Sequence, residues 1–213
     1  MSTRPPGEDE FALLRAWQQG DRGAGHALFK QHSAKVSRFF RTKVPESAED
    51  LTQNTFLALS QSGDFRGESS FRAYVFGIAR NQLLVHLRSR ALADKRFDPL
   101  TTTATDVGAS PAKLAAQRQE QRLLLQALQR IPVDYQVAVE LHYFEGLKLD
   151  ELAAALETPV GTVKSQLSRA RVLLRDALEA LAPSAELLNS AVTGLDRWMS
   201  SLTGLANDPT TTH

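Results

Sequence analysis

Cysteine is absent from the 213 residues of this sequence. Its absence excludes disulfide bonds, thiolate nucleophiles and zinc sites built on cysteine. The sequence also lacks any apolar run close to the roughly 20 residues that a membrane-spanning helix needs. No signal peptide precedes the first acidic residues, so we expect a cytoplasmic protein without a membrane span.

Motifs for catalysis and for cofactor binding are missing as well. The sequence contains no P-loop, no GxGxxG fingerprint and no HExxH zinc motif. The histidines lie far apart, without the spacing or the acidic partners of a metal site, at His26, His32, His86, His142 and His213. We therefore expect neither an enzyme nor a metal or cofactor.

The net charge of +1 conceals an uneven distribution of charge along the chain. Residues 29–91 carry 10 Lys or Arg against 5 Asp or Glu, whereas residues 113–182 carry 9 of each kind. Within the second range, residues 158–175 hold four basic side chains and no acidic one. Such a local concentration of positive charge indicates nucleic-acid binding even when the total charge is near zero.

Residues 148–175 have the pattern of two short helices joined by a sharp turn. Apolar residues recur at helical spacing in both parts, at Leu149, Leu152, Ala153 and Leu156 and then at Val160, Val163, Leu167, Ala170 and Leu174. Between them, Thr158 is a candidate N-cap and Pro159 suits the first helical position. A small Ala153 before the turn and an apolar Val163 after it allow two helices to cross closely, as in a helix-turn-helix.

The opposite face of the second of these helices is polar and basic. It carries Lys164, Ser165, Ser168, Arg169, Arg171 and Arg175. A helix with one buried face and one cationic, hydrogen-bonding face fits the major groove of DNA. A charged face alone is also typical of an ordinary solvated surface helix, but the spacing of the two helices favours the DNA-binding interpretation.

The same periodicity predicts further helices upstream, so we expect an all-α fold. These helices begin near Asp9, after Asp21, at Ala48, at Ser69 or Ser70, at Ala112 and at Asp134. The first is expected to end at Gly20-Asp21, and the last to run to Phe144 and end at Glu145-Gly146. Residues 93–110 contain proline, glycine and a threonine run without an apolar period, which is typical of a flexible linker. We therefore predict two small helical domains at 9–92 and 111–182, joined by this linker, and a C-terminal extension at 183–213.

Two helices of the first domain have informative faces. The second helix, ending near Val44, is expected to bury Leu28, Phe29, His32, Val36, Phe39, Phe40 and Val44. The third, from Ala48 to about Ser60, is expected to bury Leu51, Thr55, Ala58 and Leu59. Its other face presents Asp50, Gln53, Asn54 and Leu57 at i, i+3, i+4 and i+7, a pattern that fits either plain solvent exposure or a partner surface.

The fourth helix combines aromatic and basic residues. Phe71, Tyr74 and Phe76 precede Arg80, Arg88 and Arg90, and Gly77, Asn81 and Arg88 share one face. Aromatic rings beside cations suit the stacking of single-stranded bases. Aromatic residues at helical spacing more often belong to a core, which is our interpretation for Phe71 and Val75.

The C-terminal extension has the pattern of one more amphipathic helix at 184–205. Its apolar stripe consists of Leu188, Ala191, Leu195, Trp198, Leu202 and Leu205. Either this helix packs on the second domain and extends its core, or it docks reversibly as a regulatory element. An exposed stripe of this kind would invite a partner.

Five runs of the sequence, in this order, resemble the extracytoplasmic-function (ECF) sigma factors of bacterial RNA polymerase. They are LLRAWQQGD (13–21), AEDLTQNTFLAL (48–59), FRAYVFGIARNQL (71–83), IPVDYQVAVELHYFEGL (131–147) and TPVGTVKSQLSRAR (158–171). The resemblance implies a subunit that binds core RNA polymerase, directs it to promoters and assists strand opening. It also implies no chemistry of its own, since the polymerase makes the phosphodiester bonds.

The resemblance assigns roles to three groups of residues. The polymerase clamp would contact the third helix through Asp50 and Gln53, with Asn54 and Leu57 on the same face. A flipped base of the melted −10 element would lie in the loop at 63–70, giving as contacts Phe65, Arg66, Tyr74, Arg80, Asn81 and Arg88. The double-stranded −35 element would be read by Thr162, Lys164, Ser165, Gln166, Ser168, Arg169, Arg171 and Arg175. An anti-sigma factor would be a further partner.

The sequence departs from the family pattern at several positions. Tyr74 stands where tryptophan is frequent, and Lys148 where a capping Ser or Thr is common. Arginine is frequent at the positions of Gln136, His142 and Gln166, so each replacement is expected to remove a phosphate contact and weaken DNA binding. Glu157 occupies the place of a turn glycine, where a left-handed conformation costs about 1 kcal/mol relative to glycine.

One alternative class of protein is a helix-turn-helix activator that binds DNA without acting as a sigma factor. The motif at 148–175 does not exclude it. Such an activator needs a ligand pocket, or a phosphoacceptor aspartate after a strand, in its first half. No strand pattern is visible there, so the sigma-factor interpretation is favoured.

Overall fold

The computed structural model describes residues 8–62, 69–90, 98–104 and 119–193. Within these ranges the regular elements are helices, which confirms the all-α prediction. The chain packs as two compact units, Met1–Arg96 with Asp150–Pro159, and Phe97–Leu149 with Val160–His213. We refer to them as unit 1 and unit 2.

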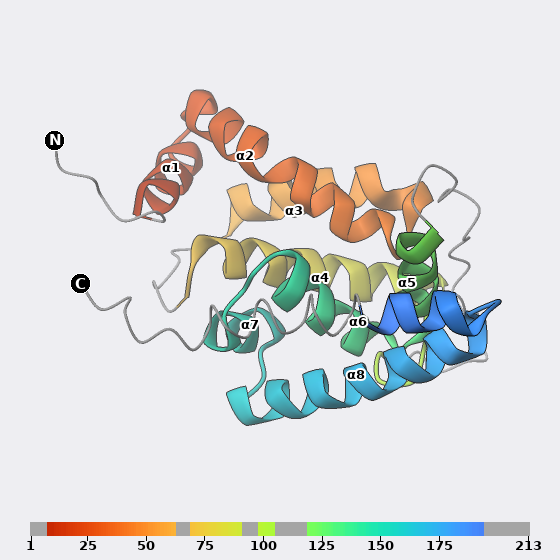
Figure 1. Ribbon diagram of the computed structural model, residues 1–213. Helices are drawn as coiled ribbons and strands as arrows, with labels where there is room; N and C mark the ends of the chain where they lie inside the picture. Colours follow the sequence, from red (N-terminus) through yellow and green to blue (C-terminus); the bar gives the residue numbers. More distant parts are fainter. Residues whose placement is uncertain (1–7, 63–68, 91–97, 105–118, 194–213) are drawn as a thin grey trace, which may run out of the picture. The chain divides into compact units, whose positions relative to one another are not determined.

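Unit 1 is built around three long helices that follow α1 (Glu8–Gln18). They are α2 (Arg22–Arg41), α3 (Ala48–Gln61), which a short 3-10 turn at Pro45–Ser47 precedes, and α4 (Phe71–Arg90). Neighbouring helices in this series lie side by side (Figure 1). Their facing sides bury a cluster of aromatic rings, in which Phe39 lies 5.8 Å from Phe76 and 5.3 Å from Phe40 between ring centroids. The period-3.6 apolar stripes thus meet in one core.

The connection from α1 to α2 confirms the predicted role of Gly20 and Asp21. Gly20 has a positive φ of 102°, and the next amide, Asp21 N–H, donates to the carbonyl of Ala16 at 2.9 Å. This arrangement closes the end of α1 as a glycine C-cap. The Asp21 carboxylate then accepts hydrogen bonds from the amides of Gly23 and Ala24, at 2.8 and 3.1 Å, and so caps α2.

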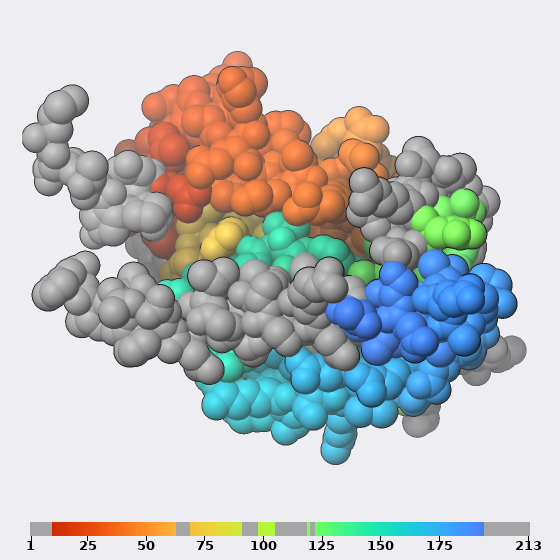
Figure 2. Space-filling view, in the orientation of Figure 1, coloured from red at the N-terminus to blue at the C-terminus, as the bar shows by residue number. Residues whose placement is uncertain are grey.

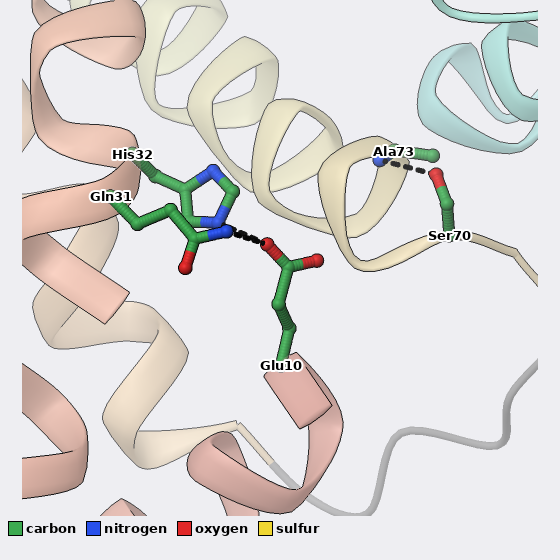
Figure 3. A network of polar contacts seen from close by, with 5 residues as sticks. All are labelled: Glu10, Gln31, His32, Ser70 and Ala73. Carbon is green, nitrogen blue, oxygen red and sulfur yellow. Dashed lines mark hydrogen bonds and ion pairs between the residues drawn. The ribbon is translucent and has the colours of Figure 1, made fainter. Parts of the chain in front are cut away.

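A polar contact also joins α1 to α2 (Figure 3). The Glu10 carboxylate accepts a hydrogen bond from Gln31 at 2.6 Å and lies 2.7 Å from Nε2 of the buried His32. The His32 ring in turn lies 5.2 Å from the ring of Phe71 in α4. Ser70 caps that helix by accepting from the amide of Ala73 at 3.2 Å. His32, at the edge of the core, thus has a polar partner on α1 and an aromatic neighbour on α4.

One residue of the predicted apolar face of α2 lies outside the core. Phe29 is 40% exposed and rests against Phe56 of α3, with 4.8 Å between ring centroids. The prediction that Phe29 is buried is wrong, because this ring lies at the margin of the α2–α3 contact. α2 also ends at Arg41, and Val44 is buried in the turn that follows it.

Unit 2 contains α5 (Gln119–Arg130), α6 (Val133–Val139), the π-helical segment Glu140–Phe144 and α8 (Val160–Leu181). The sequence predicted one regular helix through residues 134–144, but α6 widens into a π-helix at Glu140. There Glu145 N–H donates to the carbonyl of Glu140, five residues back, at 3.0 Å. Gly146 follows with a positive φ of 69° and ends the element as predicted.

Part of the predicted linker has a defined place in unit 2. Residues 98–104 form a turn that packs on the start of α6, where Val133 N–H donates to Thr102 and Asp134 N–H to Pro99, at 2.9 and 3.0 Å. α6 has Pro132 as its N-cap residue and no side-chain cap, so these carbonyls satisfy its first amides. For these residues the prediction of a flexible linker is wrong. Ala104, the last residue of this turn, is buried, and residues 93–97 and 105–110 lie outside the described residues.

The described part of the C-terminal extension is helical, as predicted. Residues 185–193 form a helix, and the preceding Ser184 caps it by accepting from the amide of Leu187 at 3.3 Å. Ala191, one of the predicted stripe, is buried at 6% exposure. Residues 194–213, with the remainder of the stripe, lie outside the described residues.

Substituting Gly25 tests the contact between α1 and α2. A Cβ built at Gly25 would lie 2.4–2.6 Å from atoms of the Trp17 indole. Alanine is favoured over glycine inside a helix by about 1 kcal/mol, but forcing extra volume against a packed ring costs about 1–3 kcal/mol. We expect Gly25→Ala to lower the free energy of unfolding by about 1 kcal/mol and to alter tryptophan fluorescence, measured in urea titrations.

The matched control for this substitution is Gly161→Ala in α8. A Cβ at Gly161 would meet no atom within 4 Å, so only the helix-propensity gain of about 1 kcal/mol should remain. Opposite signs for the two variants are the expected result. If Gly25→Ala stabilised the protein as Gly161→Ala should, Trp17 would not be packed on α2.

Candidate nucleic-acid interface

The helix α8 has the two contrasting faces that the sequence predicted. Val163, Leu167, Ala170 and Leu174 are buried, and the stripe continues to Leu178. The side chains on the other side are exposed, namely Lys164, Ser165, Ser168, Arg169, Arg171 and Arg175. Figure 2 shows one side of α8, in light blue, at the surface of the view. The four basic side chains therefore face solvent on one continuous helical surface.

Two other residues of the predicted −35 set differ in their surroundings. Thr162 is exposed in the first turn of α8. The side chain of Gln166 is half-buried, and its Oε1 is enclosed without a hydrogen-bond partner. The hydroxyl of Ser165 donates to the carbonyl of Gly161 at 3.1 Å, which leaves its oxygen able to accept from outside. Gln166 thus lies at the margin of the basic face.

Val160 contradicts its predicted place in the apolar stripe. It is the first residue of α8 and is 39% exposed, whereas Val163 in the next turn is fully buried. The prediction that Val160 is buried is wrong, because a side chain in the first turn has no preceding turn of its own helix to pack against.

The turn before α8 is closed by backbone bonds instead of the predicted side-chain cap. The helix α7 (Leu149–Leu156) ends with Glu157 at a positive φ of 54°, which confirms the left-handed turn expected there. Glu157 N–H donates to Ala154 and Thr158 N–H to Ala153, at 3.2 and 3.0 Å, the two bonds of a Schellman motif. The hydroxyl of Thr158 is enclosed without a partner, so its predicted role as an N-cap is wrong.

Glu157 provides a direct test of strain in this turn. The left-handed conformation costs an L-residue about 1–2 kcal/mol, a cost that glycine avoids. Glycine also has more conformational entropy in the unfolded chain, which offsets part of this stabilisation. We expect Glu157→Gly to raise the free energy of unfolding by about 0.5–1 kcal/mol in urea titrations. Glu157→Ala removes the same carboxylate but keeps the Cβ, so it should bring no gain. Equal gains from both variants would show that the charge, not the conformation, is the cause.

The polar face predicted on α3 is solvent-exposed. Asp50, Gln53, Asn54 and Leu57 are all exposed, Leu57 at 54%. The hydroxyls on the opposite side are turned inward, since Thr52 and Thr55 donate to backbone carbonyls one turn earlier, at 2.6 and 2.7 Å. The sequence missed Thr52 and Phe56, which are also buried. The exposed Leu57 follows the acid and the two amides along this face.

The residues predicted to contact the −10 element are only partly described. Asn81 and Arg88 are exposed on α4, and Tyr74 and Arg80 are half-buried, while Phe65 and Arg66 lie outside the described residues. Within unit 1, Asn81 donates a long hydrogen bond of 3.4 Å to the Glu157 carboxylate. Phe71 and Val75 are fully buried, which confirms that they belong to the core.

The α4 face holds one residue that the sequence reasoning missed. Val85 is 61% exposed and lies one turn from both Asn81 and Arg88. Its neighbour His86 is half-buried, and burial, followed by the nearby charge of Arg90, lowers the pKa of His86. The imidazole is therefore neutral near pH 7, and the positive charge of this face comes from its arginines.

Two positions expected to lie on the DNA-binding surface are inside unit 2. Gln136 is fully buried and donates to the Glu140 carboxylate at 2.9 Å, and His142 is buried with Nδ1 2.7 Å from the carbonyl of Leu147. The expectation that arginine at these positions would contact phosphate is wrong for this fold. An arginine at 136 would have the buried Glu140 within reach instead.

The described residues also bear on metal binding and on membrane-spanning helices. Among the described residues, no group of three or more His, Cys, Asp or Glu is placed to hold a metal ion. None of the helices that the structure describes has the length and apolar character needed to cross a membrane.

Comparisons with known sequences identify the two halves of the chain. Residues 28–92 match the family Sigma-70 region 2, and residues 121–174 match the family Sigma-70, region 4. The chain is 29% identical over 192 residues to the RNA polymerase sigma-H factor of Pseudomonas aeruginosa, covering 84% of this chain and 98% of that protein. It is 28% identical over 180 residues to the ECF RNA polymerase sigma-E factor of Haemophilus influenzae, covering 80% and 95%.

Solved structures show the same fold. CnrH in complex with the cytosolic domain of CnrY aligns with a TM-score of 0.57 and 23% identity over 81% of this chain and 98% of that chain. RpoE of Bartonella quintana, in complex with the anti-sigma factor NepR, aligns with a TM-score of 0.56 and 24% identity over 72% and 96%. With both sigma regions matched in order and relatives aligned along nearly their whole length, the chain belongs to the extracytoplasmic-function sigma factors of RNA polymerase.

Proposed function

We infer that this protein binds core RNA polymerase, directs it to specific promoters and assists strand opening at the start of transcription. The observation that carries this function is the presence of both sigma regions on one chain, each with an exposed face of the chemistry that its role requires. The α3 face is acidic and amide-rich with an exposed leucine, whereas the α8 face is basic and rich in hydroxyls. The region 2 match leaves an activator that acts without polymerase unsupported.

We propose that the α3 face, comprising Asp50, Gln53, Asn54 and Leu57, is the polymerase-binding surface. All four side chains are exposed, and the residues between them point into the core of unit 1. A rigid helix that presents an acid, two amides and a leucine offers charge steering, hydrogen bonds and an apolar contact together.

We propose that the exposed side of α8 reads the −35 element in the major groove. In helix-turn-helix proteins the N-terminal residues of the second helix contact base edges. This places Thr162, Lys164 and Ser165 closest to the bases, with Ser168 and Arg169 one turn further along. Arg171 and Arg175 lie nearer the C-terminal end, where contacts with phosphate are favoured. The exposure of these side chains supports the assignment.

The division of labour along α8 can be tested with two arginines. We expect Arg169→Ala to change the preference for −35 sequences by about 1–3 kcal/mol, the value of one lost base contact. Arg175→Ala should weaken binding to all sequences alike and reduce the slope of log K against log salt by about one. Holoenzyme binding to a set of −35 variants, over a range of salt concentrations, measures both. The reverse assignment of the two effects would mean that α8 lies in the groove with another orientation.

We propose that α4 contacts the melted −10 element through Tyr74, Arg80, Asn81 and Arg88, together with Phe65 and Arg66 of the preceding loop. Support comes from the exposure of Asn81 and Arg88 and from the basic end of the helix. A base that binds here would compete with Glu157 for the Asn81 amide, but a hydrogen bond of 3.4 Å is weak.

Further parts of the function are also proposals. The chain carries out no chemistry of its own and acts in the cytoplasm, where the polymerase is. RpoE of Bartonella quintana was solved with an anti-sigma factor, and we include a partner of that kind for this protein. Run-off transcription with purified core polymerase tests the central claim. Transcripts that depend on both the promoter and this protein are expected, and their absence would refute the sigma-factor function.

A further inference from the structure

The first turn of α8 presents an apolar side chain to solvent where the sequence pattern called for a buried one. Val160 is 39% exposed, while the later residues of the same apolar stripe are between 0 and 8% exposed, namely Val163, Leu167, Ala170, Leu174 and Leu178. Val160 begins the helix that carries the basic face. An isolated exposed valine needs no explanation on an ordinary surface, but here it lies at the end of the helix that enters the DNA groove.

The surroundings of Val160 leave it accessible to a groove. The next residue is Gly161, and a Cβ added there would meet no atom within 4 Å. Thr162 follows and is exposed, and the first long polar side chain, Lys164, comes one turn after Val160. No long side chain in this first turn competes with Val160 for the space in front of the helix end. Valine is also stiff at χ1, so little side-chain entropy is lost when it is held against a base.

The major groove contains one apolar group that such a side chain can recognise. Thymine is the only standard base that presents a methyl group there, at C5, beside hydrogen-bonding groups. The N-terminal residues of a helix-turn-helix recognition helix are the ones that contact base edges. We propose that Val160 reads the C5-methyl group of one thymine in the −35 element. This inference rests on the proposed function and adds a specificity-determining residue to it.

A second exposed valine on α8 provides a matched control. Val172 is 59% exposed, more than Val160, and stands among Arg169, Arg171 and Arg175. It lies 12 residues further along the helix, a distance of about 18 Å at 1.5 Å per residue. That position is too far from the N-terminal end to share the same base. The residue type is thus the same and both side chains are exposed, while the position on the helix differs.

The experiment uses full-length protein with core polymerase and a promoter selected by this holoenzyme from random DNA. Each thymine of the −35 element, on either strand, is replaced in turn by deoxyuridine, which lacks only the methyl group. For the wild-type protein we expect one replacement to weaken binding by roughly three- to tenfold, the value of one buried methyl contact. Val160→Ala should weaken binding to the unmodified promoter by a similar factor and be insensitive to that replacement. Val172→Ala should behave as the wild type does.

The outcomes separate this inference from the proposed function. A holoenzyme that selects no promoter would refute the sigma-factor function itself. If it selects a promoter but no deoxyuridine replacement matters, or if Val160→Ala keeps the wild-type sensitivity, the methyl contact is refuted and the function stands. A −35 element without thymine, or sensitivity lost in Val172→Ala instead, would refute it too. The deoxyuridine scan leaves the protein unchanged, so its result does not depend on how the variants fold.

Discussion

Replacing Asp50 with arginine is expected to abolish binding to core RNA polymerase while leaving the fold intact. Asp50 is exposed in the first turn of α3, on the face that also carries Gln53 and Leu57. Reversing a charge within a complementary interface costs several kcal/mol, so binding should weaken by roughly a hundredfold or more. In the free protein, a basic residue in the first turn loses only about 0.3–1 kcal/mol of interaction with the helix dipole.

The neighbouring carboxylate supplies the control for Asp50→Arg. Glu49 is also exposed in the first turn of α3, but it points about 100° away around the helix axis. Glu49→Arg makes the same change of charge and the same change near the helix dipole. Pull-down of core polymerase, together with thermal unfolding, should show lost binding for Asp50→Arg and near-normal binding for Glu49→Arg. Equal loss of binding in both variants would show that the change in net charge, and not the position of Asp50, is the cause. Normal binding by Asp50→Arg would show that polymerase contacts another surface.

Open-complex formation is expected to fail in the double variant Phe65→Ala with Asn81→Ala. Flipping a base out of the duplex costs a few kcal/mol, which contacts to the flipped base must offset. Asn81 is exposed on α4, on the same face as Arg88. Removing an aromatic surface and an amide that the family resemblance places around that base should reduce opening by roughly tenfold or more. Permanganate reactivity of thymines in the −10 region measures the opening.

Two comparisons make this result specific to strand opening. We propose that the α8 face holds the closed promoter, and on that assignment closed-complex binding should remain largely unchanged in the double variant. On a promoter with a pre-formed bubble the opening step is already made, and most of the lost activity should return. Normal permanganate reactivity on duplex promoters would show that the flipped base binds elsewhere. A loss of closed-complex binding would show that the variant damages the fold or the −35 contact.

The sequence predicted the parts of this fold that follow from periodicity. The stripe from Val163 to Leu174 and the exposed basic face of α8 follow from the 3.6-residue repeat, which holds in the middle of a helix. Gly20 was identified as a helix end because a left-handed turn restricts the residue type, and Glu157 was identified because the family resemblance places a turn glycine there. The polar face of α3 was found for the same reason as the stripes.

The wrong predictions concern residues at helix ends, where the helical repeat stops, and residues whose burial depends on packing against other elements. Val160 and Phe29 have the right spacing, but one begins its helix and the other lies at the margin of a helix contact. Gln136 looked like a substituted surface position, yet the π-helical segment nearby and Glu140 give it a buried partner. The spacing of polar residues in the sequence does not show whether a polar side chain is hydrogen-bonded in the core or exposed to solvent.

The turn at residues 98–104 has a consequence for where the second folding domain begins. The family match starts at residue 121, but the first amides of α6 donate to the carbonyls of Pro99 and Thr102. A fragment cut at the start of the match would lose both hydrogen bonds, and each contributes about 0.5–1.5 kcal/mol to stability. The region that the family match covers therefore begins later in the chain than the compact unit 2 does. A fragment designed for biophysical work should begin before Asp98.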